Sequence, residues 1–151
     1  LLYGAGDAKL GTIVGGGAAE GRAIRQRYLR GMPSFDHLQR RITRESGSGH
    51  IRGIDDRMLR VRSEHAALNT LLQSCAAVVA KLWLVHEHLP AGAFIVAMIH
   101  DELCIETDSS VSPEHIGQIS KDAIQHVAGV LDFNCPLDCD WTVGNNWSET
   151  H

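Results

Sequence analysis

Residues 94–107 of the chain read Phe-Ile-Val-Ala-Met-Ile-His-Asp-Glu-Leu-Cys-Ile-Glu-Thr, and this stretch decides the fold. Its first six residues are all apolar, which predicts a strand. Residues 102–107 then alternate between polar and apolar side chains, which predicts a second strand. Only His100 and Asp101 stand between the two. We therefore expect a tight corner that joins two antiparallel strands.

Helices are predicted on both sides of these strands. Residues 64–88 carry apolar side chains at intervals of three and four, and Ser63 precedes them as a suitable N-cap. Residues 113–131 form a second helix, which begins with a proline at its first position. Residues 135–143 are expected to form a final edge strand, and Trp147 begins a short tail.

The N-terminal third is mostly helical by the same criterion. Residues 18–45 have helical spacing that is interrupted at Gly31, and a second helix is expected to start with Ser34 as its N-cap. Residues 50–61 predict a hairpin with its turn at residues 55–56. Helices followed by an antiparallel sheet with packed helices make the expected fold class α+β.

Composition places the chain among ordinary globular proteins. Its 151 residues are 44% hydrophobic and 21% charged, which excludes collagen-like, coiled-coil and wholly disordered chains. The formal net charge is −4, but the charge is unevenly divided. Residues 1–62 hold twelve basic and six acidic side chains, whereas residues 63–151 hold two basic and twelve acidic ones. Charges of +6 and −10 suggest that the two parts face different partners.

The cysteines and the apolar runs exclude two further classes. Uninterrupted apolar runs are too short to cross a bilayer, so no membrane partner is expected. The four cysteines do not form the framework of a small secreted domain. Cys75 and Cys104 lie in apolar runs and are expected to be buried thiols. Cys135 and Cys139 lack a histidine at zinc-finger spacing, so a zinc protein is only a third alternative.

A row of polar side chains lies on the predicted helix 64–88. His65, Asn69 and Gln73 are spaced by four residues, so they stack along one face over roughly 12 Å. All three side chains can donate hydrogen bonds without a permanent charge. Such a row suits the acceptors that every base pair presents in the minor groove of DNA. The alternative is an ordinary solvated face.

The corner His100-Asp101-Glu102 is the second candidate site. An aspartate held between two strands and facing outward is well placed to bind magnesium. Two-metal phosphoryl transfer needs carboxylates from at least two elements, and the sequence offers this one obvious candidate. The alternative is an aspartate that only forms the turn.

The arginines between residues 22 and 62 are the third candidate. On a helical scaffold they would neutralise phosphates and make binding sensitive to salt. The alternative is again a solvated, basic face.

These features together resemble family A DNA polymerases. Residues 2–6, Leu-Tyr-Gly-Ala-Gly, are similar to the end of the fingers helix of that family. Residues 62–74, Arg-Ser-Glu-His-Ala-Ala-Leu-Asn-Thr-Leu-Leu-Gln-Ser, are similar to its minor-groove helix, in the form found in short-tailed bacteriophages. His100-Asp101-Glu102 matches the third polymerase motif, and residues 146–151 resemble the end of the phage chains.

The resemblance implies a division of the chain and a magnesium site. Residues 1–49 would be the remainder of the fingers, and residues 50–151 the C-terminal half of the palm. Asp101 would bind the two Mg²⁺ ions, Glu102 would support them, and His100 would lie near the primer-terminal phosphate. The family's other metal-binding aspartate belongs to a motif that precedes Leu1.

The resemblance also implies how DNA and nucleotide are held. Asn69 and Gln73 would contact the minor groove close to the primer end, with His65 further along the duplex and Arg62 beside them. Tyr3 would lie near the incoming nucleotide. The implied partners are primer–template DNA and dNTPs, with a processivity factor on a thumb that this chain lacks.

The sequence is therefore interpreted as the C-terminal part of a phage-type family A DNA polymerase. The parent reaction would be templated transfer of deoxynucleotides to a primer 3′-end, in the cytoplasm of an infected or uninfected bacterium. The 151 residues alone are expected not to polymerise. Asp56 stands where the family usually has glycine in the hairpin turn. The competing interpretation is a non-catalytic DNA-binding module or a polymerase remnant.

Overall fold

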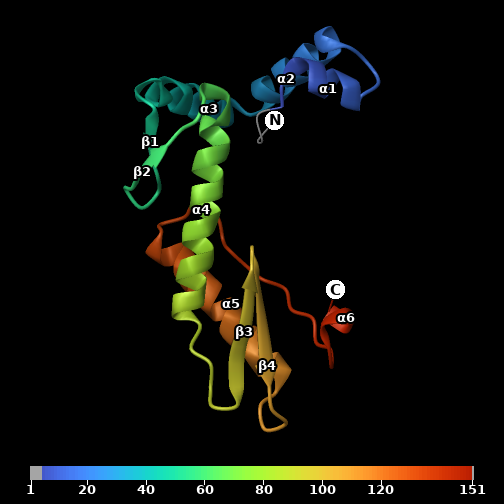
Figure 1. Cartoon of the computed structure of the whole chain (residues 1–151), viewed down its shortest axis with the longest axis vertical. Helices are drawn as coiled ribbons and strands as arrows, with labels where there is room; N and C mark the ends of the chain where they lie inside the picture. The colour runs from blue at the N-terminus through green and yellow to red at the C-terminus, as the bar shows by residue number, and fades with distance from the viewer. Residues whose placement is uncertain (1–4, 151) are drawn as a thin grey trace. The chain divides into compact units, whose positions relative to one another are not determined.

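A computed structural model describes residues 5–150 of the chain (Figure 1). The chain divides into two compact units, residues 1–75 and 76–151, and each is described by itself. Both combine helices with one small antiparallel hairpin, so the predicted α+β class is confirmed. The predicted boundary after residue 49 lies inside the first unit. It divides the chain by role rather than by packing, and it stays a prediction.

Two helices in close contact begin the first unit. They are α1 (Asp7–Ile13) and α2 (Ala18–Gly31). A Cβ atom on Gly21 would lie 1.8 Å from the carbonyl oxygen of Asp7, and one on Gly11 would lie 1.9 Å from that of Gly17. Only glycine therefore allows these backbones to meet. Glycines in this region made α1 hard to predict from the sequence, and yet Gly11 and Gly21 are the residues that allow it to pack against α2.

The next helix, α3 (Pro33–Glu45), begins one residue earlier than predicted. Ser34 was expected to be its N-cap, but Met32 occupies that position and makes no side-chain capping bond. Pro33 at the first helical position explains the difference. Its fixed φ suits the start of a helix, and it has no N–H that needs a cap.

A short hairpin follows, with β1 (His50–Arg52) paired to β2 (Met58–Arg60). The short 3-10 helix η1 (Ser46–Ser48) precedes it. Asp56 adopts a left-handed conformation with φ 62° in the turn, where glycine is the least strained residue. The core of this unit gathers side chains from α3, the hairpin and the following helix: Ile42, Ile51, Val61 and Ala67.

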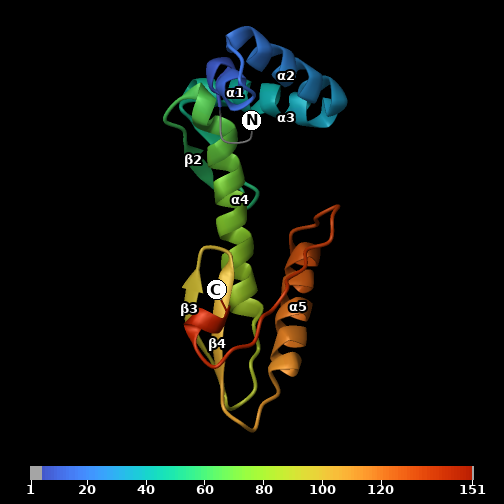
Figure 2. The ribbon, with the colours of Figure 1, turned by 90° about the vertical axis from the view of Figure 1, so that its right-hand side faces the viewer.

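The helix α4 (Glu64–His86) runs from the first unit into the second. It starts directly after Ser63 as predicted, and the Ala66 N–H donates to the Ser63 carbonyl at 3.0 Å. Its far end, around Trp83, packs against α5 (Pro113–Val130) (Figure 2). The indole Nε1 of Trp83 donates to the Ser120 carbonyl at 3.0 Å.

Among the described residues, α4 is the one helix long and apolar enough to cross a membrane by length and composition. Core helices of soluble proteins pass the same test, so this is weak evidence. The helix also carries Asn69 and Gln73, and polar side chains of this kind are costly in lipid unless they find partners. These polar side chains argue against a membrane span, while only 17% of the helix's membrane-length window is buried within the structure.

The second unit contains the hairpin that the sequence placed at the centre of the fold. Strands β3 (Ala93–Ile99) and β4 (Glu102–Thr107) pair antiparallel, with an irregularity between Ile95 and Ala97. Leu103 of β4 packs against a cluster formed by α4 and α5, whose buried members are Trp83, Ala123, Ile124 and Val127. The outer face of β3 stays open, because Phe94 and Val96 are 63% and 60% exposed.

The predicted edge strand at residues 135–143 is wrong, since no strand forms in this segment. Leu137 and Cys139 pack on the α4–α5 cluster, and the Trp141 ring covers Gly117 of α5. The alternating pattern therefore reflects packing on helices rather than pairing with a strand. Trp147 begins a short helix, α6 (Trp147–Thr150).

The prediction of buried thiols is also wrong. Cys75 and Cys104 are both only half-buried. Cys75 lies on a partly exposed turn of α4. Cys104 lies on a strand whose central residues are all half-buried, because a sheet of two strands shields little surface.

Candidate functional site

The polar row on α4 is present as the spacing predicts. His65, Asn69 and Gln73 occupy one face of a continuous helix. His65 and Gln73 are exposed, and Asn69 is half-buried. Arg62 is exposed directly before the helix and has no carboxylate partner among residues 5–150. The row is therefore exposed at both ends and half-buried at its centre.

Asn69 carries the most informative atom of this row. Its Oδ1 is buried and finds no hydrogen-bond partner among the described residues. A buried polar atom without a partner costs roughly 1–3 kcal/mol, so such an atom calls for an explanation. A ligand that presents acceptors would contact the Nδ2 amide group of Asn69 rather than this buried oxygen.

The corner between β3 and β4 holds the second candidate set. Ile99 pairs with Glu102, so His100 and Asp101 alone form the connection. Both are exposed, and neither makes a side-chain hydrogen bond or ion pair with any of the described residues. His100 has φ 56°, in the left-handed region that favours glycine. A short, strained connection thus projects Asp101 outward from the end of the sheet.

Glu102 lies at the start of β4 with a different environment from Asp101. It is half-buried, and its Oε1 accepts a hydrogen bond from the Cys104 thiol at 3.4 Å. Burial, and then this bond to Glu102, raise the pKa of the Cys104 thiol. The thiol therefore remains a donor at neutral pH and helps to orient the carboxylate beside the corner.

The structure brings each candidate set together locally. His65, Asn69 and Gln73 share one helix of the first unit, and His100, Asp101 and Glu102 share one hairpin of the second. Tyr3, the predicted nucleotide-binding residue, lies outside the described residues. Within residues 5–150 no group of three or more histidine, cysteine or acidic side chains is placed to hold a metal ion. Cys135 and Cys139 therefore form no such group.

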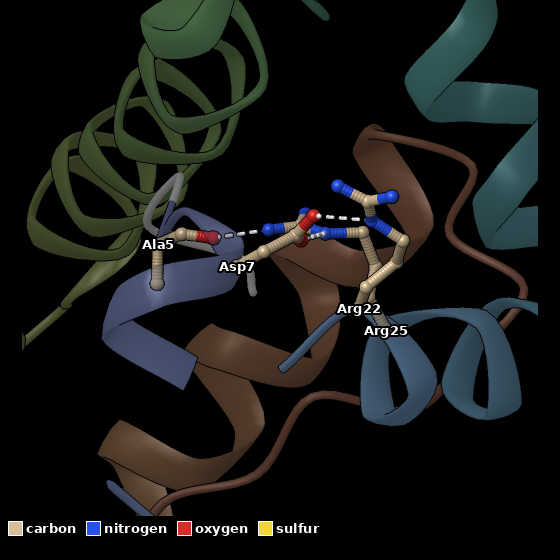
Figure 3. A network of polar contacts seen from close by, with 4 residues as sticks. All are labelled: Ala5, Asp7, Arg22 and Arg25. Atoms are coloured by element: carbon tan, nitrogen blue, oxygen red, sulfur yellow. Dashed lines mark hydrogen bonds and ion pairs between the residues drawn. The ribbon is translucent and has the colours of Figure 1, made fainter. Parts of the chain in front are cut away.

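The basic segment includes contacts that sequence reasoning missed. Figure 3 shows Asp7 of α1 between two arginines of α2. Arg25 Nε donates to Asp7 Oδ1 at 2.6 Å, and Arg22 Nε lies 3.5 Å from Oδ2. The Arg25 guanidinium also donates to the Ala5 carbonyl at 2.5 Å. The hydrogen bond from Arg25 is the largest cause that lowers the pKa of Asp7.

The ion pairs divide the eleven arginines into two groups. Six are paired with carboxylates and support the local fold: Arg22, Arg25, Arg40, Arg41, Arg52 and Arg57. Five have no carboxylate partner among residues 5–150: Arg27, Arg30, Arg44, Arg60 and Arg62. The second group is the one available to an external anion. From the sequence, Asp7 could be expected only as an acidic residue in the first turn of a helix, and its arginine partners could not be foreseen.

A buried carboxylate at the end of α4 was also missed. Glu87 is 8% exposed, and its Oε1 accepts a hydrogen bond from Ser120 Oγ at 2.6 Å. Burial raises the pKa of Glu87, although the Ser120 hydroxyl acts in the opposite direction. This contact joins α4 to α5 and lies within the core of the second unit.

Comparisons with known proteins identify the family of the chain. The family model of DNA polymerase family A matches residues 1–149. The DNA-directed DNA polymerases of Enterobacteria phage T3 and Escherichia phage T7 are 34% and 33% identical to the chain over its whole length. The chain spans 25% of the length of each. The expected similarity to phage polymerases is thereby confirmed.

A more distant sequence relative and a solved structure are also similar to the chain. The thermostable DNA polymerase I of Thermus filiformis is 28% identical over 99% of the chain and 19% of its own length. A solved structure of the POL domain of Pol1 from M. smegmatis, in complex with DNA primer-template and dNTP, has the same fold. It matches with a TM-score of 0.73 and 17% identity over 83% of this chain and 25% of that one. This chain belongs to DNA polymerase family A.

Proposed function

We propose that the chain supplies the duplex-tracking helix and one catalytic corner of a template-directed DNA polymerase. The family match over residues 1–149 carries this proposal. Two local observations support it: the polar row is intact on α4, and Asp101 projects from a corner without an ion-pair partner among the described residues. The reaction would add deoxynucleotides to a primer 3′-end.

The α4 row would follow the minor groove of the primer–template duplex. His65, Asn69 and Gln73 would hydrogen-bond to purine N3 and pyrimidine O2, which lie in similar positions in all correct base pairs. Arg62 would contact a backbone phosphate beside the row. Such contacts test the geometry of a pair rather than its sequence. Tyr3 would lie near the incoming dNTP.

Asp101 is the residue that we propose to bind magnesium. An exposed carboxylate, backed by a second one in Glu102, fits the preference of Mg²⁺ for oxygen ligands and water. When bound, two Mg²⁺ ions would stabilise the attacking and leaving oxygens of the displacement. Asp101 and Glu102 are too few to hold both ions, so a further carboxylate would come from polypeptide outside residues 1–151. His100 would lie near the primer-terminal phosphate.

The partners and location follow from the same proposal. They are primer–template DNA and dNTPs, in the cytoplasm of a bacterium or of a bacterium infected by a phage. A processivity factor would bind a thumb subdomain, and no part of the proposal requires a membrane. The isolated chain would bind duplex DNA without extending a primer.

A chimera tests the catalytic part of the proposal. This chain would replace the matching quarter of the phage T3 relative, and primer extension would be measured with Mg²⁺ and all four dNTPs. We expect extension by the chimera, loss of extension in Asp101→Asn, and unchanged DNA binding in that variant. Extension that survives Asp101→Asn would favour the non-catalytic module instead.

Duplex binding by the 151-residue chain tests the α4 row. Fluorescence anisotropy with a blunt duplex should show binding that weakens about thirtyfold in Asn69→Ala/Gln73→Ala, because two hydrogen bonds of about 1 kcal/mol each are lost. Gln125→Ala, on an exposed position of α5, is the matched control. Equal binding by both variants would contradict the assignment of the row.

A further inference from the structure

Arg25 of α2 holds the start of α1 through two different groups (Figure 3). Its Nε donates to the Asp7 carboxylate at 2.6 Å, and its Nη2 donates to the Ala5 carbonyl at 2.5 Å. Both acceptors belong to the residues at which α1 begins, whereas Arg25 lies 18 residues beyond Asp7 in the sequence. One planar guanidinium therefore fixes a backbone group and a side chain of the same segment.

Arg22, which lies on α2 one turn before Arg25, makes a weaker contact with the same carboxylate. Its Nε lies 3.5 Å from Asp7 Oδ2, and its side chain is 68% exposed, against 23% for Arg25. Among residues 5–150, Asp7 is its one hydrogen-bond or ion-pair partner. Water and salt screen exposed ion pairs, so Arg25 makes the stronger contact and also the one that reaches Ala5.

The backbones of α1 and α2 meet beside these side chains. Gly21 precedes Arg25 by about one helical turn, so the two residues lie on the same side of α2. The close approach of Gly21 to the Asp7 carbonyl leaves no space for a Cβ atom. The start of α1 is therefore held on α2 in two ways, by backbone packing and by a charged contact that is largely shielded from water.

The residues that Arg25 anchors come directly after Tyr3 in the sequence. Tyr3 itself lies outside the described residues, and it precedes Ala5 by two positions. Two residues of polypeptide span at most about 7 Å, so a fixed Ala5 carbonyl restricts the region that Tyr3 can reach. In the proposed function Tyr3 lies near the incoming dNTP. An anchor at Ala5 would therefore act on a residue of the proposed nucleotide site.

We propose that Arg25 is a positioning residue for nucleotide binding, because it fixes the segment that follows Tyr3. Its guanidinium is already engaged by Asp7 and Ala5, so it would act through this segment without touching the dNTP. The contact would raise the fraction of molecules that are ready to bind a nucleotide. Apparent affinity falls in proportion to that fraction, whereas saturating ligand draws every molecule into the competent state. This role rests on the proposed function.

The first test replaces each of the two arginines by lysine in the chimera with the phage T3 relative. Lysine keeps the charge and can still pair with Asp7, but its single nitrogen does not reproduce the fork that reaches two acceptors. Single-turnover primer extension is measured over a range of dNTP concentrations. Arg25→Lys should raise the half-saturating dNTP concentration about tenfold and leave the maximal rate within about twofold, as expected when the positioned fraction falls to about one tenth.

Arg22→Lys is the matched control for this test. It makes the same chemical change one turn away, at a side chain that contacts Asp7 without reaching Ala5. The half-saturating dNTP concentration and the maximal rate should both stay within about twofold of the parent chimera. Affinity for primer–template DNA should be the same in both variants, because neither loses a charge.

Amide hydrogen exchange in the 151-residue chain tests the anchor without any activity. The Leu10 N–H donates to the Gly6 carbonyl at 3.0 Å, so its protection reports whether the first turn of α1 is formed. Arg25→Lys should speed exchange at Leu10 about tenfold, because the start of α1 opens more often. Arg22→Lys should leave this exchange unchanged. NMR spectroscopy measures both variants.

Several results would overturn the proposal. Equal rises of the half-saturating dNTP concentration in the two variants would mean that the contact with Ala5 has no special role. Faster exchange at Leu10 with an unchanged dNTP dependence would make Arg25 a purely structural residue. Unchanged exchange in Arg25→Lys would show that this contact does not hold the start of α1.

Failure of the proposed function would look different. The parent chimera would then extend no primer, while exchange at Leu10 in the 151-residue chain would still respond to Arg25→Lys and not to Arg22→Lys. That result would remove the nucleotide site, and with it the positioning role, but it would keep the anchor. An active chimera whose dNTP dependence ignores Arg25→Lys would remove only the positioning role.

Discussion

The two hairpins of the molecule turn in similar ways and use their acidic residues differently. Each places a non-glycine residue at positive φ in its turn, Asp56 at 62° and His100 at 56°. In the β1–β2 hairpin, Asp56 is 3.1 Å from Arg52, and Asp55 pairs with Arg57. In the β3–β4 hairpin, Asp101 has no ion-pair partner among the described residues.

We propose that this difference separates a structural turn from a functional one. An aspartate that is already neutralised by arginine stabilises its own loop and has little charge left for a ligand. An aspartate that is exposed, unpaired and held by a short connection keeps its full charge for a cation. The local environment therefore tells more about Asp101 than the tripeptide in which it stands.

The test with the largest expected effect replaces one aspartate by asparagine at each of the two turns. In the chimera, Asp101→Asn should lower primer extension by about 10³-fold or more, since a lost metal ligand removes several kcal/mol of transition-state stabilisation. Asp56→Asn should leave extension within about twofold of the parent. Steady-state primer extension with Mg²⁺ measures both. Similar losses in the two variants would contradict the division into structural and functional turns.

The second test concerns strain. His100→Gly should stabilise the 151-residue chain by about 1 kcal/mol, because glycine adopts positive φ without the penalty of a Cβ atom. Asp56→Gly should increase the stability of the chain by less, since it also removes the contact with Arg52. Urea unfolding compares the two. A larger gain from Asp56→Gly would mean that the ion pair at the first turn contributes nothing.

The third test measures how the stability of the chain depends on pH in the acidic range. Burial alone would raise the pKa of Asp55, but the hydrogen bonds and charge of Arg57 outweigh it and lower that pKa. A lowered pKa means that the ionised form stabilises the fold. This contribution is complete above the unfolded value near 3.9 and disappears as pH falls through the folded pKa. Arg57→Gln should therefore flatten the acid limb of stability measured by thermal unfolding.

Arg27→Gln is the control for this acid test, because Arg27 is exposed and has no carboxylate partner among residues 5–150. It should keep the acid dependence of the parent chain. An unchanged profile in Arg57→Gln would show that the Asp55 contact does not persist in solution.

The smallest effect on stability is expected for the ion pair between Arg52 and Asp56. Arg52 and Asp56 are 67% and 81% exposed, and exposed pairs contribute about 0.2–1 kcal/mol. Arg52→Ala should therefore destabilise the chain by a few tenths of a kcal/mol, and 1 M salt should remove the difference. Thermal unfolding at low and high salt measures it. A loss above 2 kcal/mol would mean that Arg52 does more than pair with Asp56.

Much of the fold followed from local patterns. The apolar spacing of α4 and α5 and the two-residue corner after Ile99 are properties of short segments, so sequence alone predicted them. The helix α1 was missed because Gly11 and the glycines on either side of the helix lower helix propensity, while the packing that favours it comes from α2. The false edge strand near Cys139 arose because alternation cannot distinguish a strand partner from a helix partner.

The candidate site was predictable to a similar depth. Asp101 and the row that includes Asn69 stand in patterns that can be recognised from sequence. The buried Oδ1 of Asn69 and the thiol contact of Glu102 depend on burial and side-chain placement, which a pattern does not carry. The arginines look alike in sequence, and only the ion pairs show which of them, such as Arg30, have no carboxylate partner among residues 5–150.

The close contact of α1 with α2 has an evolutionary consequence. Every single-base change that replaces glycine at residue 11 or 21 introduces at least a Cβ atom, and neither position has space for one. Both codons should therefore be under strong purifying selection even though neither side chain takes part in chemistry. Two glycines ten residues apart would then mark this helix pair in related genes whose surface arginines have diverged.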